Sequence, residues 1–148
     1  MKPESSNNAS VIMINLVEEF KTEHIAITDL FAQIQRLGIL TREGRDCLTS
    51  CKNKLLDHLK KEDREFYPVL LKNKKILKAS KSLITKYHRE FEEVTQRAVN
   101  FFATYSISGG GIEFLRDFNQ FKVILEDRIK REEDTLFPEI LKFYKTKS

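Results

Sequence analysis

The sequence predicts an all-α protein, an up-down-up-down four-helix bundle. Prolines and glycines occur at only a few positions, which divide the chain into four long intervals. Within each interval the apolar residues recur with alternating steps of four and three, and the connections between intervals are short. The chain has 148 residues, 41% of them apolar, which is enough for one compact core. We therefore expect one domain at residues 10–148, preceded by a flexible tail at residues 1–9.

The ends of the four predicted helices follow from capping and breaking residues. Ser10 is a suitable N-cap for the first helix, and Gly38 is a suitable C-terminal stop. Thr41 marks the start of the second helix, and the run of glycines after residue 108 separates the third helix from the fourth. The predicted spans are 10–38, 41–67, 75–105 and 111–136, with a last turn or short helix after Pro138.

Polar residues interrupt the apolar stripe of every predicted helix. The four stripes run through positions 13 to 34, 48 to 62, 84 to 102 and 114 to 132. On the third helix the stripe is read as 84, 88, 91, 95, 98 and 102. Apart from Thr95, the polar members of the four stripes are His24, His58, Glu62, His88, Arg128 and Glu132. All three histidines of the chain are thus expected in the core.

The chain also contains an internal repeat around these polar positions. The stretch "HLKKEDREFYPVLLK" at 58–72 aligns with "RIKREEDTLFPEILK" at 128–142. The alignment pairs Glu62 with Glu132 and Pro68 with Pro138, but it pairs His58 with Arg128. One copy of an HxxxE unit, which places both side chains on one helical face, has therefore lost its histidine.

This set of residues favours a metal site over a hydrogen-bonded network. Buried charges that lack partners cost several kcal/mol, so the polar residues must satisfy one another or bind an ion. Histidines and glutamates together suit iron or manganese, with zinc as an option. The two similar halves suggest two metals, bridged by Glu62 and Glu132, with His24 and His58 terminal on one and His88 on the other.

These residues resemble the hemerythrin family of HHE cation-binding domains. The resemblance rests on "TEHIAITDLF", "LLDHLKKEDREFYP", "YHREFEEV" and "RIKREEDTLFP" and covers about residues 10–142. It implies a hemerythrin-like bundle around a non-haem di-iron site, with two iron ions (Fe²⁺ or Fe³⁺) that an oxo or hydroxo group can bridge. The family includes oxygen carriers, oxygen or redox sensors, an iron-sensing domain of a ubiquitin ligase, and proteins linked to nitric oxide and iron–sulfur repair.

The sequence departs from the family pattern at two positions. Arg128 stands where the fourth helix should carry a histidine, and arginine keeps its proton and is not a ligand. Glu92 stands where the oxygen carriers have a second histidine on the third helix. If Glu92 binds metal, a pair of ions is retained; if it pairs with Arg128, the second site is weak, mononuclear or asymmetric.

Residues next to the expected ligands have two candidate roles. Tyr67 is placed to donate a hydrogen bond to bound oxygen or to carry a radical, although helix-end packing is the simpler role. Asp63 and Glu133 directly follow the two expected bridges and are candidates for orienting the imidazoles. Because they lie one residue further round the helix, we expect both to face water.

The functional expectation is a module that binds or senses O₂ or NO, or responds to redox or iron state. A di-iron oxidoreductase (ferroxidase, peroxide or NO reduction) and a bundle with a degenerate mononuclear or metal-free site are the alternatives, so enzymatic activity is left open.

The net charge of +4 comes with no nucleic-acid recognition pattern, and the chain has no signal sequence or membrane-length apolar run. We expect a cytoplasmic protein with no nucleic-acid or membrane partner, while a protein partner is an option.

Overall fold

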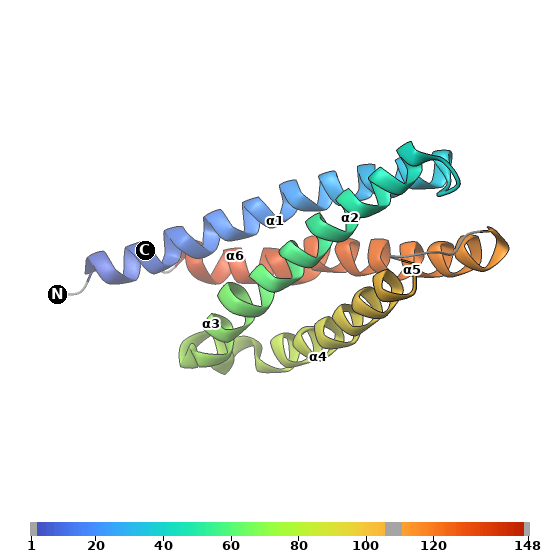
Figure 1. The fold of residues 1–148 in the computed structure, drawn as a ribbon. Coiled ribbons are helices and arrows are strands. Elements are labelled where there is room, and N and C mark those ends of the chain that lie inside the picture. Colours follow the sequence, from blue (N-terminus) through green and yellow to red (C-terminus); the bar gives the residue numbers. More distant parts are fainter. Residues whose placement is uncertain (1–2, 106–110, 147–148) are drawn as a thin grey trace.

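The computed structural model describes residues 3–105 and 111–146 and shows four long helical rods (Figure 1). The first rod is a single helix, α1 (Pro3–Leu37), and the third is α4 (Lys74–Tyr105). The second and fourth rods each consist of an α-helix, a π-helical turn and a second α-helix. Their parts are α2 (Arg42–Lys61), η1 (Glu62–Phe66) and α3 (Tyr67–Lys72), then α5 (Gly111–Arg131), η2 (Glu132–Leu136) and α6 (Phe137–Thr146).

The expected all-α bundle is confirmed, and most of its helix ends lie where capping residues place them. Gly38 has a φ of 69° and follows α1, with its N–H donating to the carbonyl of Ile34 (2.7 Å). The Thr41 side chain caps α2 by accepting from the Gly44 N–H (3.1 Å). The first helix, however, begins at Pro3 rather than near Ser10. The predicted loop at 106–110 lies outside the described residues.

The two internal prolines do not end their rods. The short helix expected after Pro138 is present as α6, whereas the second rod, which was expected to end near Tyr67, continues past Pro68 as α3. Proline lacks an N–H and its ring crowds the carbonyl of the preceding turn. Directly before each proline the helix widens into a π turn, in which the Tyr67 N–H donates to the Glu62 carbonyl and the Phe137 N–H donates to the Glu132 carbonyl. The wider turn accommodates the proline, and the rod continues as α3 or α6. The internal repeat is therefore a structural repeat.

The apolar stripes of the first, second and fourth rods are buried as predicted, and so are positions 84, 91, 98 and 102 of the third rod. At its other two predicted positions, 88 and 95, the preceding residue is buried instead. Tyr87 and Val94 are buried in α4, whereas His88 and Thr95 are half-buried. The steps 84, 87, 91, 94, 98 and 101 also alternate between three and four, and they collect more apolar surface than the set that we predicted. The expectation that all three histidines lie in the core is wrong for His88.

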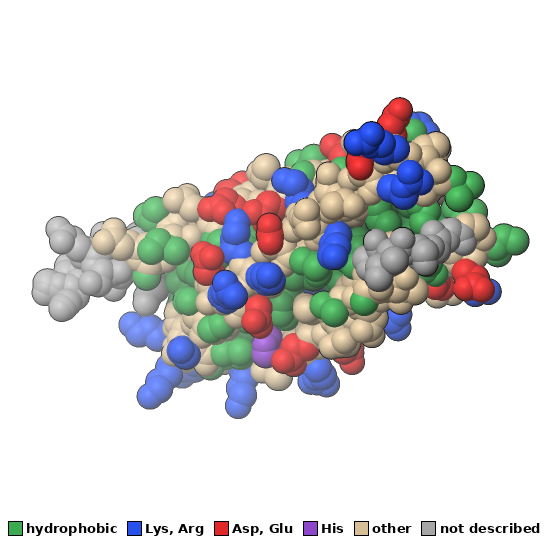
Figure 2. Space-filling view, in the orientation of Figure 1, with side chains coloured by type: hydrophobic (Ala, Val, Ile, Leu, Met, Phe, Trp, Pro, Cys, Tyr) green, Lys and Arg blue, Asp and Glu red, His purple; other side chains and the backbone are tan. Residues whose placement is uncertain are grey.

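One cluster of surface lysines lies at one end of the bundle. Figure 2 shows Lys and Arg side chains gathered over α3 and the start of α4, where Lys72, Lys74, Lys75, Lys78 and Lys81 are exposed. Within residues 3–105 and 111–146, no helix combines the length and the apolar character needed to cross a membrane. The polar residues of the core lie instead near the middle of the rods.

Candidate metal centre

Five polar side chains from three rods are buried together in the bundle. His24 comes from α1, His58 and Glu62 from the end of α2 and the start of η1, and Arg128 and Glu132 from the end of α5 and the start of η2. None of the five is more than 4% exposed. We call His24, His58, Glu62 and Glu132 the donor cluster, because each of them carries an atom that can bind a metal.

The donor cluster consists of two histidine–glutamate pairs that face each other. His24 Nε2 lies 3.3 Å from Glu132 Oε1, and His58 Nε2 lies 3.2 Å from Glu62 Oε1. The centroids of the two imidazole rings are 4.9 Å apart. The two glutamates belong to equivalent positions of the structural repeat, at the first residue of each π turn. The cluster thus brings two imidazoles and two carboxylates into one small volume.

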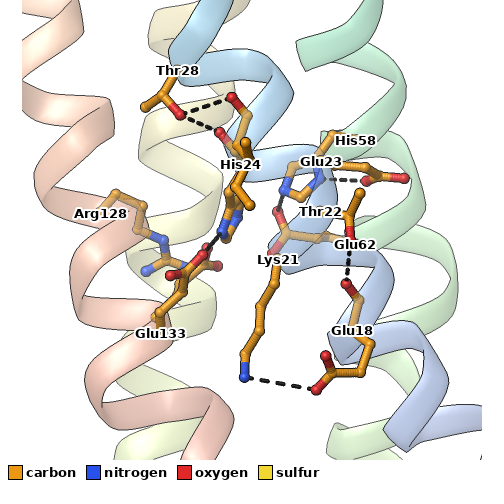
Figure 3. A network of polar contacts seen from close by, with 12 residues as sticks. Glu18, Lys21, Thr22, Glu23, His24, Thr28, His58, Glu62, Arg128 and Glu133 are labelled. Atoms are coloured by element: carbon orange, nitrogen blue, oxygen red, sulfur yellow. Dashed lines mark hydrogen bonds and ion pairs between the residues drawn. The ribbon is translucent and has the colours of Figure 1, made fainter.

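A second carboxylate holds the outer face of each imidazole (Figure 3). His24 Nδ1 lies 2.7 Å from Glu133 Oε2, and His58 Nδ1 lies 2.6 Å from Glu23 Oε1. A carboxylate can only accept, so both Nδ1 atoms carry a proton and the Nε2 atoms face inward. Paired in this way, a histidine is oriented for metal binding.

One of these outer carboxylates corrects the sequence expectation, and the other was not foreseen. Glu133, which we expected to face water, contacts His24, whereas its repeat counterpart Asp63 is exposed as expected. Glu23 was not considered as a site residue. It directly precedes His24 in the sequence, and its position next to a stripe histidine was the only available signal.

The electrostatics of the cluster reflect burial opposed by close pairing. Burial lowers the pKa of His58, but the charge of Glu62 and the hydrogen bond to Glu23 outweigh it and raise this pKa to about 10. Burial also lowers the pKa of His24, and Glu132 more than compensates, so that this pKa is raised. Burial, then the neighbouring Glu132 carboxylate, raises the pKa of Glu62. In the absence of a metal, protons neutralise the cluster, and a bound cation would have to displace them.

Arg128 and the donor cluster line one cavity. Most of the contacts of Arg128 are with residues outside the donor cluster. Its Nη2 donates to the Tyr67 hydroxyl (2.5 Å) and lies 3.2 Å from Glu132 Oε2. Its Nη1 donates to Glu90 Oε1 at 3.5 Å, and its guanidinium carbon lies 5.1 Å from the centroid of the Tyr87 ring. The expected carboxylate partner was Glu92, so this expectation is wrong and Glu90 takes its place.

The structure does not bring His88 and Glu92 to the cluster. His88 is half-buried, and its ring packs against Tyr67 with centroids 5.1 Å apart. Glu92 is exposed and lines a surface pocket of about 350 Å³ between α2 and α4. Tyr67, in contrast, is fully buried and contacts Arg128 through its hydroxyl, so it does more than pack at a helix end.

The donor cluster has the residue types of a metal site, but its side chains are not close enough together to coordinate one ion as they stand. Among the described residues, no group of three His, Cys, Asp or Glu side chains converges closely enough to hold a metal ion as it stands. Three buried donor atoms nevertheless lack a hydrogen-bond partner: His24 Nε2, Glu62 Oε2 and Glu132 Oε2. His24 Nε2 has only its 3.3 Å contact with Glu132 Oε1, and Glu132 Oε2 has only its ion pair with Arg128. Buried polar atoms without a hydrogen-bond partner are rare in native proteins, and each of them calls for an explanation such as a bound ion. Small side-chain movements would let a cation serve as that partner.

Comparisons with known proteins give one match. The model of the hemerythrin HHE cation-binding domain matches residues 15–140, a span that includes every member of the donor cluster. No curated protein and no solved structure matches the chain.

Proposed function

The chain belongs to the hemerythrin HHE cation-binding family, and from this membership we propose that it binds iron at the donor cluster. The proposal extends to function: the bound iron lets the domain bind or sense O₂ or NO, or respond to redox or iron state. Manganese and zinc are the competing metals, since the same imidazole and carboxylate donors suit them.

The observation that carries the proposal is the set of unpartnered donor atoms. His24 Nε2, Glu62 Oε2 and Glu132 Oε2 come from separate rods and are buried, and none of them has a hydrogen bond of good geometry. His24 Nε2 and Glu132 Oε2 have ion-pair contacts only, with Glu132 Oε1 at 3.3 Å and with Arg128 at 3.2 Å. Leaving one such atom unsatisfied costs about 1–3 kcal/mol. A bound cation would satisfy all three together, which a hydrogen-bonded network of these side chains does not do.

The surrounding residues supply the conditions that a reactive metal needs. Glu23 and Glu133 orient the two imidazoles from outside, and Ile27, Leu55 and Leu125 line the cavity and exclude water. Iron held there would supply a redox couple and a coordination position for a small diatomic ligand. The same features fit an oxidoreductase, which remains the alternative within the metal-binding class.

A metal-free bundle is the second candidate function, and Arg128 is the observation that favours it. The guanidinium lies 3.2 Å from Glu132 Oε2, so it already compensates one of the two buried carboxylates. A protonated histidine can compensate the other. In this case the cluster would be a structural network, and the domain would act through a protein partner.

Metal loading separates these candidates. The chelator-treated protein is titrated anaerobically with Fe²⁺, and bound iron is measured by elemental analysis after desalting. We expect stable binding that His58→Ala weakens by at least about a hundredfold, since even residues that only orient ligands contribute 10–100-fold. His88→Ala is the matched control and should leave the affinity unchanged.

The possible results point to different conclusions. Absence of iron from the wild-type protein would favour the metal-free bundle. Equal losses of iron affinity in His58→Ala and His88→Ala would mean that His88, on α4, is also a ligand. An absorption change that reverses when O₂ or NO is removed would support a binding or sensing role, whereas continuous consumption of an oxidant would support an enzyme.

A further inference from the structure

We infer that the donor cluster holds a single metal ion, because the guanidinium of Arg128 occupies the position of a second cation. This inference rests on the proposed function and narrows it. The fold repeats its helix–π turn–helix unit, and a symmetric pair of ions would need equivalent donors from both halves. The structure provides an asymmetric site instead, with imidazoles on one side of the two glutamates and a fixed positive charge on the other.

The contacts of Arg128 form a complete binding site for a guanidinium. Tyr67 and Glu90 accept from its two terminal nitrogens, Glu132 forms an ion pair with it, and the Tyr87 ring lies against it. Arg128 itself is only 3% exposed. A side chain held by four groups from three rods does not swing away to admit a metal at low cost. The positive charge is therefore a permanent part of the site.

The second ion also lacks a nitrogen ligand on this side. His88 does not line the cavity. Its ring packs against the fully buried ring of Tyr67, whose hydroxyl contacts Arg128. Arg128 stands at the helical position that is one turn before Glu132 and cannot ligate.

As the side chains stand, the space inside the cluster is small. The cavity bounded by the donor cluster and Arg128 has a volume of about 10 Å³. This is close to the smallest volume that admits one water molecule. Paired metal ions in proteins are separated by roughly 3.5–4 Å, and a second dication at that spacing would lie against the guanidinium. One ion between the histidines and the glutamates avoids both problems.

Stoichiometry and affinity for Mn²⁺ test the inference. The chelator-treated wild-type protein and its variants are titrated calorimetrically, bound manganese is counted by elemental analysis, and electron paramagnetic resonance reports whether the ion is isolated or coupled to another. We expect one isolated ion per wild-type chain. Arg128→Met removes the fixed charge and should tighten this ion by at least about tenfold, because two like charges repel strongly in a buried site.

Two control variants isolate the charge of Arg128. Arg131→Met lies on the same helix and also loses a contact with Glu90, but Arg131 does not line the cavity, so its affinity should stay within about twofold of wild type. Arg128→Lys keeps the charge but not the shape of the guanidinium, so it should bind one ion with an affinity closer to that of wild type than to that of Arg128→Met. If Arg128→Met does not fold, the number of manganese ions bound by Arg128→Lys still tests the inference without it.

Each outcome decides the matter. Two coupled ions in the wild-type protein would overturn the inference while leaving the proposed metal binding intact. No ion in the wild-type protein would overturn both. Equal affinities in Arg128→Met and Arg131→Met would show that the Arg128 charge does not act on the site, which also contradicts the inference.

Discussion

At the scale of single residues, the outer carboxylates decide how the histidines present themselves. Glu133 and Glu23 each hold a histidine Nδ1 at hydrogen-bond distance, which fixes the ring and directs Nε2 inward. Glu23 is itself held by Lys61, whose Nζ donates to it at 2.6 Å. The hydrogen bond to His58 is the main reason why the pKa of Glu23 is lowered to about 2. Glu23 is thus kept as a charged acceptor.

Replacing an outer carboxylate should weaken metal binding without removing a ligand. We expect Glu133→Ala to lower the metal affinity by about 10–100-fold, because His24 would lose its orientation and part of its basicity. Asp63→Ala is the matched control, since Asp63 is the repeat counterpart of Glu133 and is exposed. Calorimetric titration with Fe²⁺ measures both. Equal affinities in the two variants would mean that the contact between Glu133 and His24 does not support the metal.

At the scale of the helices, the sequence predicted the rods well and their faces less well. Caps and glycines located the rod ends at Gly38 and Thr41, because their chemistry is local. The π turns were not foreseen, since they depend on how a buried glutamate and a proline share one turn. In such a turn successive residues lie closer together around the axis, which helps to explain why Glu133 stays near Glu132 and reaches His24.

The third rod shows how two apolar stripes compete within one helix. The stripe with Tyr87 and Val94 is buried, and the stripe with His88 and Thr95 is displaced toward the surface. The predicted stripe is wrong at these two positions and right at Ile84, Phe91, Ala98 and Phe102. Apolar burial decides the orientation of a long helix, because each buried methylene contributes about 0.8 kcal/mol. This is also why His88 could not be placed from its spacing alone.

Adjacent substitutions on α4 should therefore differ in their cost. We expect Val94→Ala to lower the free energy of unfolding by about 2 kcal/mol, through lost burial and a residual cavity. Thr95→Ala should change it little or raise it slightly, because the Thr95 hydroxyl oxygen is buried without a hydrogen-bond partner. Urea unfolding followed by circular dichroism measures both variants. A larger loss of unfolding free energy in Thr95→Ala than in Val94→Ala would mean that the face with His88 and Thr95 is the buried one.

At the scale of the whole molecule, the bundle does not depend on its polar centre for folding. At one end of the bundle the start of α1 lies near α6, and the rods pack along their length (Figure 1). Apolar cores lie on both sides of the donor cluster, with Phe20 and Phe66 on one side and Phe31 and Phe121 on the other. The polar centre is one layer within this core, in contrast to small domains that unfold without their metal.

Metal binding should consequently raise the stability of an already folded protein. At a free Fe²⁺ concentration of about 100 times the dissociation constant, we expect a gain of about 2.7 kcal/mol in the free energy of unfolding. For a chain of this length the gain corresponds to a rise in Tm of about 5–10 °C. Anaerobic calorimetry with and without a chelator measures the shift, and far-ultraviolet circular dichroism checks that the metal-free protein keeps its helices.

His88→Ala should retain the shift and His24→Ala should lose it, because only His24 belongs to the donor cluster. A chelated protein that is unfolded at 25 °C would show that the apolar layers cannot sustain the bundle alone, and an unchanged Tm would count against metal binding at this site.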